Sequence, residues 1–296
     1  MQHPRPGEVL FTERTPRVVA ARQLQRRRDR DAARRFLVEG PQAVREALGS
    51  PAAPGTRSPR ADQAAPSSGA AGRAGVVELF VTPEAADRYP DLVAEAPSVS
   101  VVTEQAMASL ADTVHPQGLV AVCEFLDVPL RAALASGPGL VVVLAGIADP
   151  GNAGTVLRTA DAAGASVVVF PDDTVDPYNG KCVRASAGSL FHVDVVRGGD
   201  SLACVGALRD AGLRVLAADA YGAHDLDRYT DDGGLSGRTA WVFGAEAHGL
   251  APEVARAAHA RVKVPIHGRA ESLNLAAAAA VCLYASARAA RRPAAS

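Results

Sequence analysis

The clearest pattern in the chain is a series of short apolar runs, each followed by a polar segment that contains glycine. Residues 140–145 and 166–170 are two such runs, rich in β-branched side chains, and they predict strands buried on both faces. Between them, apolar residues at helical spacing predict a helix that ends at Gly164. A strand, a helix and a strand in this order predict two parallel neighbours in one sheet.

The same alternation continues to the end of the chain. We expect strands at 190–196, 214–218 and 239–243, a helix at 202–211 and an alanine-rich terminal helix at about 272–291. Residues 172–189 and 219–238 are expected to be loops. The pattern therefore predicts an α/β domain over residues 140–296.

A smaller set of alternating elements comes first. Residues 36–48 predict a strand, a turn at Gly40-Pro41 and a helix. Strands are expected at 76–82, 98–102 and 118–124, and helices at 84–94 and 104–110. These elements predict a small α/β domain over residues 1–125, joined to the next domain by a linker at 126–139.

One segment of the small domain breaks this alternation. Residues 49–75 consist mainly of Pro, Ala, Gly and Ser, with almost no large apolar side chain. Such a segment buries too little surface to offset its ordering entropy, so we interpret it as a disordered insertion.

Composition narrows the class of protein. The chain is 48% hydrophobic, no apolar run approaches the ~20 residues of a membrane helix, and the first residues lack the apolar part of a secretory signal. The four cysteines are widely spaced and form no C-x-x-C pair, which indicates buried thiols and neither a zinc site nor a disulfide framework. We expect a soluble cytoplasmic protein with no metal and no membrane partner.

Candidate chemistry follows the strand at 140–145. Gly151 and Gly154 have no side chain to cover the backbone N–H groups where a helix begins. The N-terminus of a helix suits an anionic or nucleotide-like ligand. Asn152 and Arg158 lie in the same segment. The glycine spacing fits neither the dinucleotide fingerprint nor the P-loop, and a plain turn with a solvated arginine explains this segment equally well when it is taken alone.

Two further strand ends carry polar residues. Glu246 follows the strand at 239–243 between glycines, and Ser272 and Asn274 open the terminal helix. Three strand ends that each supply a glycine and a polar side chain are typical of a site beyond the carboxyl ends of an α/β sheet.

Together these three segments resemble the SpoU (TrmH-type) methyltransferases of the SPOUT superfamily. The first family motif matches at Asn152, Gly154 and Arg158, and the second, Gly-x-Glu-x-x-Gly, at Gly244, Glu246 and Gly249. The third, Pro-x-x-Gly-x-x-x-Ser-Leu-Asn, matches at Pro265, Gly268, Ser272, Leu273 and Asn274. Ile266 stands where the family usually has Met.

The resemblance implies a trefoil-knotted, mostly parallel sheet flanked by helices, with S-adenosylmethionine as cofactor. Family members bind it mainly through backbone groups, which we expect here at Ala218, Gly244, Val264 and Leu273. The implied reaction is methyl transfer to a ribose 2′-hydroxyl of RNA. Family members are typically homodimers through the knotted domain, so a homodimer is expected.

The resemblance also assigns five catalytic side chains, Asn152, Arg158, Glu246, Ser272 and Asn274. Family precedent has Arg158 activate the hydroxyl, but a guanidinium stays charged and is a poor base. Arg158 is therefore expected to stabilise the developing alkoxide or to fix a phosphate. The sequence does not assign the group that accepts the proton of the hydroxyl. Asn152 is expected to orient Arg158 or the ribose, and Glu246 to hold a cation or a polar loop group. Ser272 and Asn274 are expected to tighten the third loop.

The small first domain more loosely resembles the L30e-like substrate-binding domain of rRNA-directed members, through Glu39-Gly40 and the segment 115–118. The net charge is −1, yet seven arginines lie between Arg22 and Arg35. We expect this stripe, including Arg26 and Arg27, to contact RNA phosphates. A solvated helix face is the alternative.

The predicted loop 172–189 contains the sequence Arg-Ala-Ser-Ala-Gly, which resembles a family segment that places substrate phosphate. Arg184 begins this sequence, and Lys181 lies just before it. Both are expected to bind RNA, because arginine in particular can hold phosphate with two parallel bonds. An arginine in solvent at a helix start is the alternative.

The resemblance favours a methyltransferase acting on rRNA, with 23S rRNA as the expected substrate. A tRNA substrate and a resistance enzyme that modifies rRNA are alternatives within the enzyme class. A non-catalytic RNA-binding assembly factor is the alternative from another class, and the intact motif residues argue against it.

Overall fold

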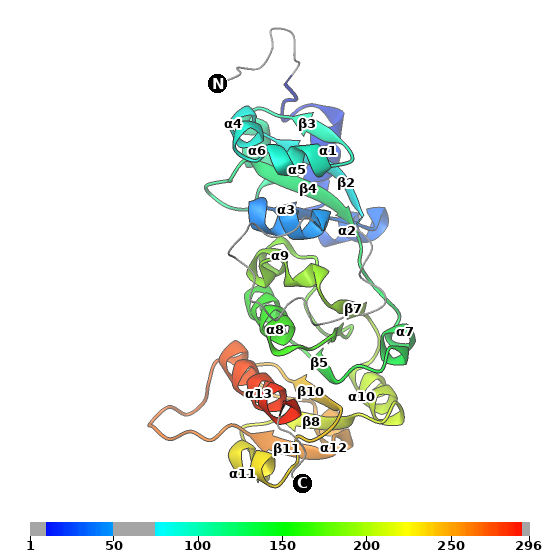
Figure 1. Cartoon of the computed structure of the whole chain (residues 1–296), viewed down its shortest axis with the longest axis vertical. Helices are drawn as coiled ribbons and strands as arrows, with labels where there is room; N and C mark the ends of the chain where they lie inside the picture. Colours follow the sequence, from blue (N-terminus) through cyan, green and yellow to red (C-terminus); the bar gives the residue numbers. More distant parts are fainter. Residues whose placement is uncertain (1–9, 50–74, 292–296) are drawn as a thin grey trace. The chain divides into compact units, whose positions relative to one another are not determined.

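The computed structural model describes residues 10–49 and 75–291. They form two compact units (Figure 1), one up to Leu126 together with Tyr178–Phe191, the other Asp127–Pro177 together with the residues from His192 on. The predicted disordered insertion, 49–75, lies outside the described residues except for its two end glycines. Within the described ranges, no helix has both the length and the apolar character needed to cross a membrane.

The first unit contains a four-stranded mixed sheet in the order β1-β4-β2-β3. Strand β4 (Leu119–Glu124) is antiparallel to both β1 (Arg35–Glu39) and β2 (Val76–Val81), and β3 (Val99–Val101) is parallel to β2. On one face, Phe80 and Val120 pack against α1 (Pro16–Gln23) and α6 (Glu104–Leu110). The predicted alternation of the first domain is confirmed in outline.

The other helices of this unit are short. They are α2 (Arg27–Ala33), α3 (Pro41–Leu48), α4 (Pro83–Arg88) and α5 (Pro90–Glu95). The single helix predicted at 84–94 is wrong, because Pro90 cannot continue the first helix and instead begins the second. Gly40 has φ of +90°, which allows the chain to turn from β1 into α3.

Residues 178–191 also belong to the first unit, although they come from the second half of the sequence. The predicted loop 172–189 is therefore wrong in part, since it contains α9 (Gly180–Ser186) and is followed by a 3-10 turn, η2 (Ser189–Phe191). Tyr178 is buried, its ring stacks on Phe125 with centroids 4.2 Å apart, and its hydroxyl accepts a 2.7 Å hydrogen bond from the Leu126 N–H. Aromatic packing therefore holds this segment in the first unit.

The second unit contains a seven-stranded parallel sheet in the order β7-β6-β5-β10-β8-β11-β9. The strands are β5 (Leu140–Leu144), β6 (Val167–Phe170), β7 (Asp194–Arg197), β8 (Arg214–Ala218), β9 (His224–Asp225), β10 (Thr239–Phe243) and β11 (Ala260–Lys263). The predicted parallel α/β class is confirmed.

Several boundaries of the second unit differ from the prediction. The strand expected at 190–196 begins only at Asp194, after η2, and the linker at 126–139 contains α7 (Leu130–Ala135). The loop expected at 219–238 contains β9 and α11 (Leu226–Asp231), which Asp225 caps at its N-terminus. The terminal helix, α13 (Leu275–Ala290), begins three residues after the predicted start at about residue 272.

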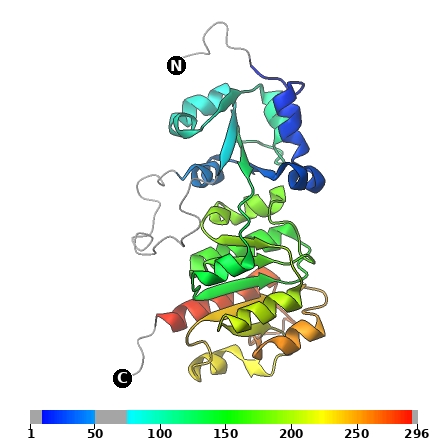
Figure 2. The same cartoon turned by 90° about the vertical axis from the view of Figure 1, so that its right-hand side faces the viewer.

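Helices cover both faces of this sheet (Figure 2). Helices α8 (Pro150–Ala163) and α13 pack side by side, and on this face Trp241 of β10 is fully buried and donates from Nε1 to Ser286 of α13 at 2.8 Å. On the other face, Val143 and Val242 pack against α10 (Ser201–Asp210) and α12 (Pro252–Ala257). Strands buried on both faces explain the continuous apolar runs.

All four cysteines are free and buried, as predicted. Burial raises the pKa of the Cys282 thiol to about 12 and also raises that of Cys123. These two thiols are therefore not nucleophiles at neutral pH.

Candidate active site

The carboxyl ends of three strands meet at one position in the second unit. Ala218, the last residue of β8, lies in register with Phe243 of β10 on one side and Val262 of β11 on the other. Gly244 and Val264, which directly follow these strands, are therefore placed at the same edge of the sheet as Ala218. Three of the four residues predicted to bind the cofactor come together here.

The first motif lies inside a helix, which begins before the apolar residues whose helical spacing predicted it. Helix α8 begins at Pro150, and Asp149 is its N-cap, accepting a 2.7 Å hydrogen bond from the Asn152 N–H. Gly151 and Gly154 are therefore helical. An Asp directly before a Pro is a common start of a helix, and this signal could have placed the boundary correctly.

Three residues from the three predicted motifs are joined by hydrogen bonds. The side-chain amide of Asn274 donates to Glu246 Oε1 at 2.9 Å and to Asn152 Oδ1 at 3.3 Å. Glu246 Oε1 also accepts the Leu275 N–H at 3.2 Å. Asn274 Oδ1 in turn caps α13 by accepting from the N–H groups of Ala276 and Ala277. This cluster links the start of α8, the loop after β10 and the start of α13.

The structure does not bring the other two predicted catalytic residues into this cluster. Arg158 lies on α8 with an exposed side chain, and Ser272 is exposed in the loop before α13. Among the described residues, neither side chain makes a hydrogen bond or an ion pair. Arg158 is thus a permanently charged group that remains available to a ligand.

The loop after β10 is a tight hairpin. The N–H of Ala245 donates to the Gly249 carbonyl at 3.1 Å, and the N–H of Gly249 donates back to the Ala245 carbonyl at 2.8 Å. A Cβ on Gly244 would lie 2.4 Å from the Gly249 carbonyl carbon, so only glycine fits there. The hairpin turns the chain so that Glu246 can reach Asn274.

The loop before α13 presents its backbone to solvent. Residues 266–274 are exposed, and within the described chain no backbone hydrogen bond engages the N–H groups of residues 266–273. A cofactor that is recognised by main-chain groups needs such unpaired donors beside bare glycine backbone. Residues 266–273 and Gly244 therefore fit the backbone recognition that was predicted for S-adenosylmethionine.

Two supporting residues were not predicted. The Thr174 hydroxyl donates to the Leu144 carbonyl and accepts the Gly146 N–H at 3.0 Å, which fixes the chain after β5. Asp219 accepts from Arg261 at 2.7 Å and its N–H donates to the Val262 carbonyl at 3.0 Å, which fixes the chain after β8. Nothing in the local sequence pattern marks either contact, because each joins distant segments.

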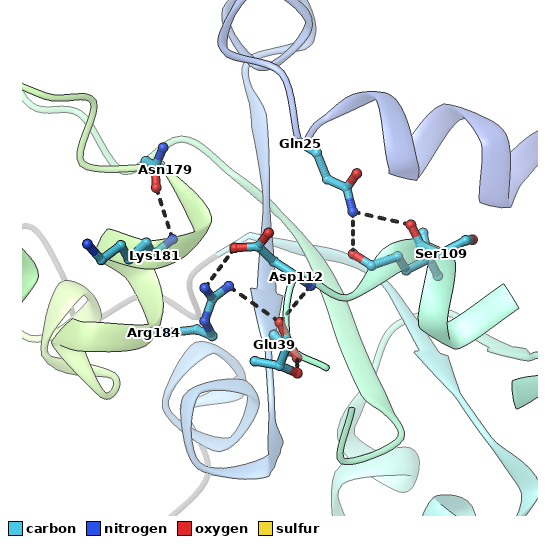
Figure 3. A network of polar contacts seen from close by, with 9 residues as sticks. Gln25, Glu39, Ser109, Asp112, Asn179, Lys181 and Arg184 are labelled. Carbon is cyan, nitrogen blue, oxygen red and sulfur yellow. Dashed lines mark hydrogen bonds and ion pairs between the residues drawn. The ribbon is translucent and has the colours of Figure 1, made fainter. Parts of the chain in front are cut away.

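The residues predicted to bind RNA lie in the first unit. Figure 3 shows the Arg184 guanidinium directed at two carboxylates, with Nη2 at 2.7 Å from Asp112 Oδ2 and Nη1 at 3.6 Å from Glu39 Oε2. Lys181 is exposed on the same helix. Arg26 and Arg27 are exposed at the start of α2, where Arg27 lies 3.7 Å from Asp31. The alternative of an arginine in solvent is therefore wrong for Arg184, which is held by acidic partners.

Comparison with protein families gives two matches within the chain. Residues 139–284 match the SpoU rRNA Methylase family, and residues 69–129 match the family described as RNA 2′-O ribose methyltransferase substrate binding. The first range contains every residue of the predicted catalytic and cofactor-binding site.

Individual relatives cover nearly the whole chain. The chain is 31% identical to the 23S rRNA guanosine 2′-O-methyltransferase RlmP of Bacillus subtilis over 89% of its own length and 92% of that protein. An AdoMet-bound rRNA methyltransferase from Sinorhizobium meliloti has 29% identity and a TM-score of 0.74, covering 95% of this chain and 97% of that one. The SpoU methyltransferase AviRb from Streptomyces viridochromogenes, also in complex with AdoMet, has 25% identity and a TM-score of 0.73 over 93% and 98%.

Proposed function

Since this chain belongs to the SpoU family of RNA 2′-O-ribose methyltransferases, we propose that it methylates the ribose 2′-hydroxyl of a guanosine in 23S rRNA, with S-adenosylmethionine as the methyl donor. The observation that supports this most directly is the hydrogen-bonded cluster of Asn152, Glu246 and Asn274. Its members come from three separate family motifs, and they meet where backbone groups are available to the cofactor.

In this proposal the cofactor is held by main-chain groups around Ala218, Gly244, Val264 and Leu273. When bound, S-adenosylmethionine supplies a methyl group on a sulfonium that is already a good leaving group. The protein therefore has to orient the hydroxyl, let its proton pass to a base or to water, and stabilise the negative charge that develops on the oxygen as this proton leaves.

Arg158 is the residue best suited to stabilise that charge. Its guanidinium is permanently positive, exposed and, within the described residues, not neutralised by a carboxylate. Asn152 lies on the same helix and would orient the ribose, and Ser272, next to Leu273, would tighten the loop whose main-chain groups hold the cofactor. Glu246 acts indirectly, because its carboxylate holds Asn274 and the N-terminus of α13 in place.

The first unit is proposed to bind the RNA substrate. Arg26 and Arg27 supply exposed positive charge on α2, and Lys181 supplies it on α9. Phosphate neutralisation by such groups makes binding fall steeply with added salt. Arg184 contributes to the same surface while it remains paired with Asp112.

A homodimer is proposed through α13. This helix exposes Val281 (43%) and Tyr284 (53%), and with Leu226 of α11 they line a cavity of about 880 Å³. Asp227, Asp231, Arg288 and Arg291 also line this cavity, and a surface that combines exposed apolar with charged side chains suits a second copy as its cover. The molar mass in solution, measured by light scattering, tests the dimer.

We also propose a cytoplasmic location, because rRNA is the proposed substrate.

The test of the reaction is transfer of radiolabelled methyl groups from S-adenosylmethionine to separated rRNA and tRNA pools. We expect label in 23S rRNA, resistant to alkali at one dinucleotide, and a loss of at least about a hundredfold in rate in Arg158→Ala. Label in tRNA would instead identify a tRNA enzyme. An absence of both label and cofactor binding would overturn the proposal.

A further inference from the structure

The first unit contains a small cavity outside the motif cluster. Its volume is about 110 Å³, several times the roughly 10–15 Å³ that one water molecule requires. All residues that line it belong to the first unit. Its walls include four aliphatic side chains, Leu24, Leu37, Leu110 and Val120. A small cavity that combines aliphatic walls with polar side chains suits a flat, partly apolar ligand.

The polar residues at this cavity keep part of their hydrogen-bonding capacity. Asp112 Oδ2 accepts from Arg184, whereas no described residue donates to Oδ1, and the Asp112 side chain is 60% exposed. Gln25 donates from Nε2 to the Ser109 and Leu110 carbonyls, which leaves its Oε1 as an unused acceptor in the described structure. Asn179 uses Oδ1 to accept the Lys181 N–H, and among the described residues its Nδ2 donor is unused.

These groups are held in place by contacts with the rest of the unit (Figure 3). Glu39 accepts the Asp112 N–H at 3.1 Å and the Thr113 hydroxyl, while Arg184 bridges the Glu39 and Asp112 carboxylates. The two bonds from Gln25 fix the link between α1 and α2 against the end of α6. Preorganised donors and acceptors reduce the entropy that a ligand loses on binding.

The pattern of unused groups distinguishes between the nucleobases. Asp112 Oδ1 and Gln25 Oε1 are acceptors, and a carboxylate can only accept. Among the four bases, guanine alone has two adjacent donor groups on one edge, N1–H and the 2-amino group, and its O6 would accept from Asn179 Nδ2. Adenine, cytosine and uracil each present one donor group on that edge, so one acceptor would remain unpaired.

The surroundings fit RNA. Gln25 lies between exposed arginines in the sequence, Arg22 before it and Arg26 after it, so positive charge is available next to the cavity. Proteins that read RNA sequence take unstacked bases into such cavities while basic side chains hold the backbone. We propose that this cavity, bounded by Gln25, Asp112 and Asn179, binds one unstacked guanine of the RNA substrate. This inference rests on the proposed function, which makes RNA the substrate.

The test is binding of a fluorescein-labelled, uridine-rich RNA oligonucleotide with one central guanosine, measured by fluorescence anisotropy with the full chain and without S-adenosylmethionine. The comparison RNA has inosine at that position, because inosine lacks only the 2-amino group. We expect the guanosine oligonucleotide to bind about tenfold more tightly, as for one hydrogen bond to a charged group. In the inferred complex the 2-amino group donates to Asp112 Oδ1. In Asp112→Asn the remaining oxygen is needed by Arg184, so an amide nitrogen takes the place of Oδ1, and we expect the preference to fall to less than about twofold.

Asp87→Asn is the matched control. Asp87 is an exposed carboxylate on α4 outside the cavity, so this variant loses the same charge and should keep the roughly tenfold preference. Equal binding of the two oligonucleotides by the wild type would overturn the inference without depending on any variant. An undiminished preference in Asp112→Asn would overturn it as well.

The outcome is separable from that of the proposed reaction. A protein that methylates 23S rRNA but does not distinguish guanosine from inosine would refute the cavity assignment alone. A protein that prefers guanosine but transfers no methyl group to any RNA would refute the reaction alone.

Discussion

Glu246 and Asn274 are 28 residues apart in the sequence, yet a 2.9 Å hydrogen bond joins their side chains. The same Glu246 oxygen accepts the N–H of Leu275, and Asn274 caps the helix that begins there. One carboxylate thus fixes both the side chain and the first backbone group at the start of α13. The loop that is proposed to hold the cofactor ends at this point.

Replacing Asn274 separates helix capping from the contact with Glu246. Asn274→Ala removes both and should cost about 1 kcal/mol in the free energy of unfolding, as the loss of an N-cap does. Asn274→Asp keeps the capping oxygen but places a second carboxylate against Glu246. We therefore expect Asn274→Asp to keep the stability that capping contributes, with repulsion from Glu246 offsetting part of it, and to bind S-adenosylmethionine more weakly in calorimetry. If the Asp variant binds the cofactor like the wild type, the contact has no role in the site.

Two glycines should respond to alanine in opposite directions. A Cβ at Gly244 would lie 2.4 Å from the Gly249 carbonyl carbon, so Gly244→Ala must open the hairpin and should destabilise the protein by about 1–3 kcal/mol. Gly206 lies within α10, where an added Cβ would meet nothing within 4 Å, and Gly206→Ala should stabilise by about 0.5–1 kcal/mol. Thermal unfolding of both variants provides the comparison. Equal shifts of the melting temperature in the same direction for both variants would contradict the steric argument.

The sequence predicted a structural feature well where residues within the same segment determine that feature. The apolar run at 140–145 and the helix end at Gly164 were predicted closely, because burial on both faces and a left-handed glycine leave direct marks in the sequence. The two helices on either side of Tyr89 were predicted as one, although Pro90 was a visible signal.

Other features have no local signal. Tyr178 is in a segment that was predicted as a loop, and its contacts with Phe125 and Phe36, which are distant in the sequence, help to explain its burial. The motif residues of the candidate site came from a family resemblance. Their spacing alone did not predict that Asn152 and Asn274 would be in hydrogen-bond contact. The knotted path of the chain stays a prediction from that resemblance.

Tyr178 should contribute to stability through both its ring and its hydroxyl. Tyr178→Phe leaves the Leu126 N–H without its partner and should cost about 1 kcal/mol, whereas Tyr178→Ala also removes the stack on Phe125 and should cost about 3–5 kcal/mol. Urea unfolding of both variants gives these values. A Phe variant as unstable as the Ala variant would show that the hydrogen bond dominates.

Stability should decrease at alkaline pH because of the buried thiols. The pKa of Cys282 is raised to about 12, so its thiol keeps its proton in the folded protein after an unfolded thiol, with its ordinary pKa near 9, has lost it. The unfolded state then binds fewer protons, and the free energy of unfolding falls as pH rises from about 9 towards 12. We expect a loss of about 1 kcal/mol from this thiol between about pH 8 and 10.

Cys282→Ala provides the measurement. The variant should be less stable at about pH 8 because it leaves a cavity in the core, but its stability should fall less steeply with pH than that of the wild type. Urea unfolding at about pH 8, 9 and 10 yields both slopes. Parallel slopes would assign the alkaline loss to other groups.

The placement of residues 178–191 limits how the chain can be divided. A polypeptide that ends at Leu126 would lack Tyr178, leaving the aromatic face of Phe36 and Phe125 without its cover. A polypeptide that begins at Asp127 would retain Tyr178 without those partners. Neither half produced by one cut is therefore a natural folding unit, and a functional exchange of the first unit between relatives requires two stretches of the gene to be replaced together.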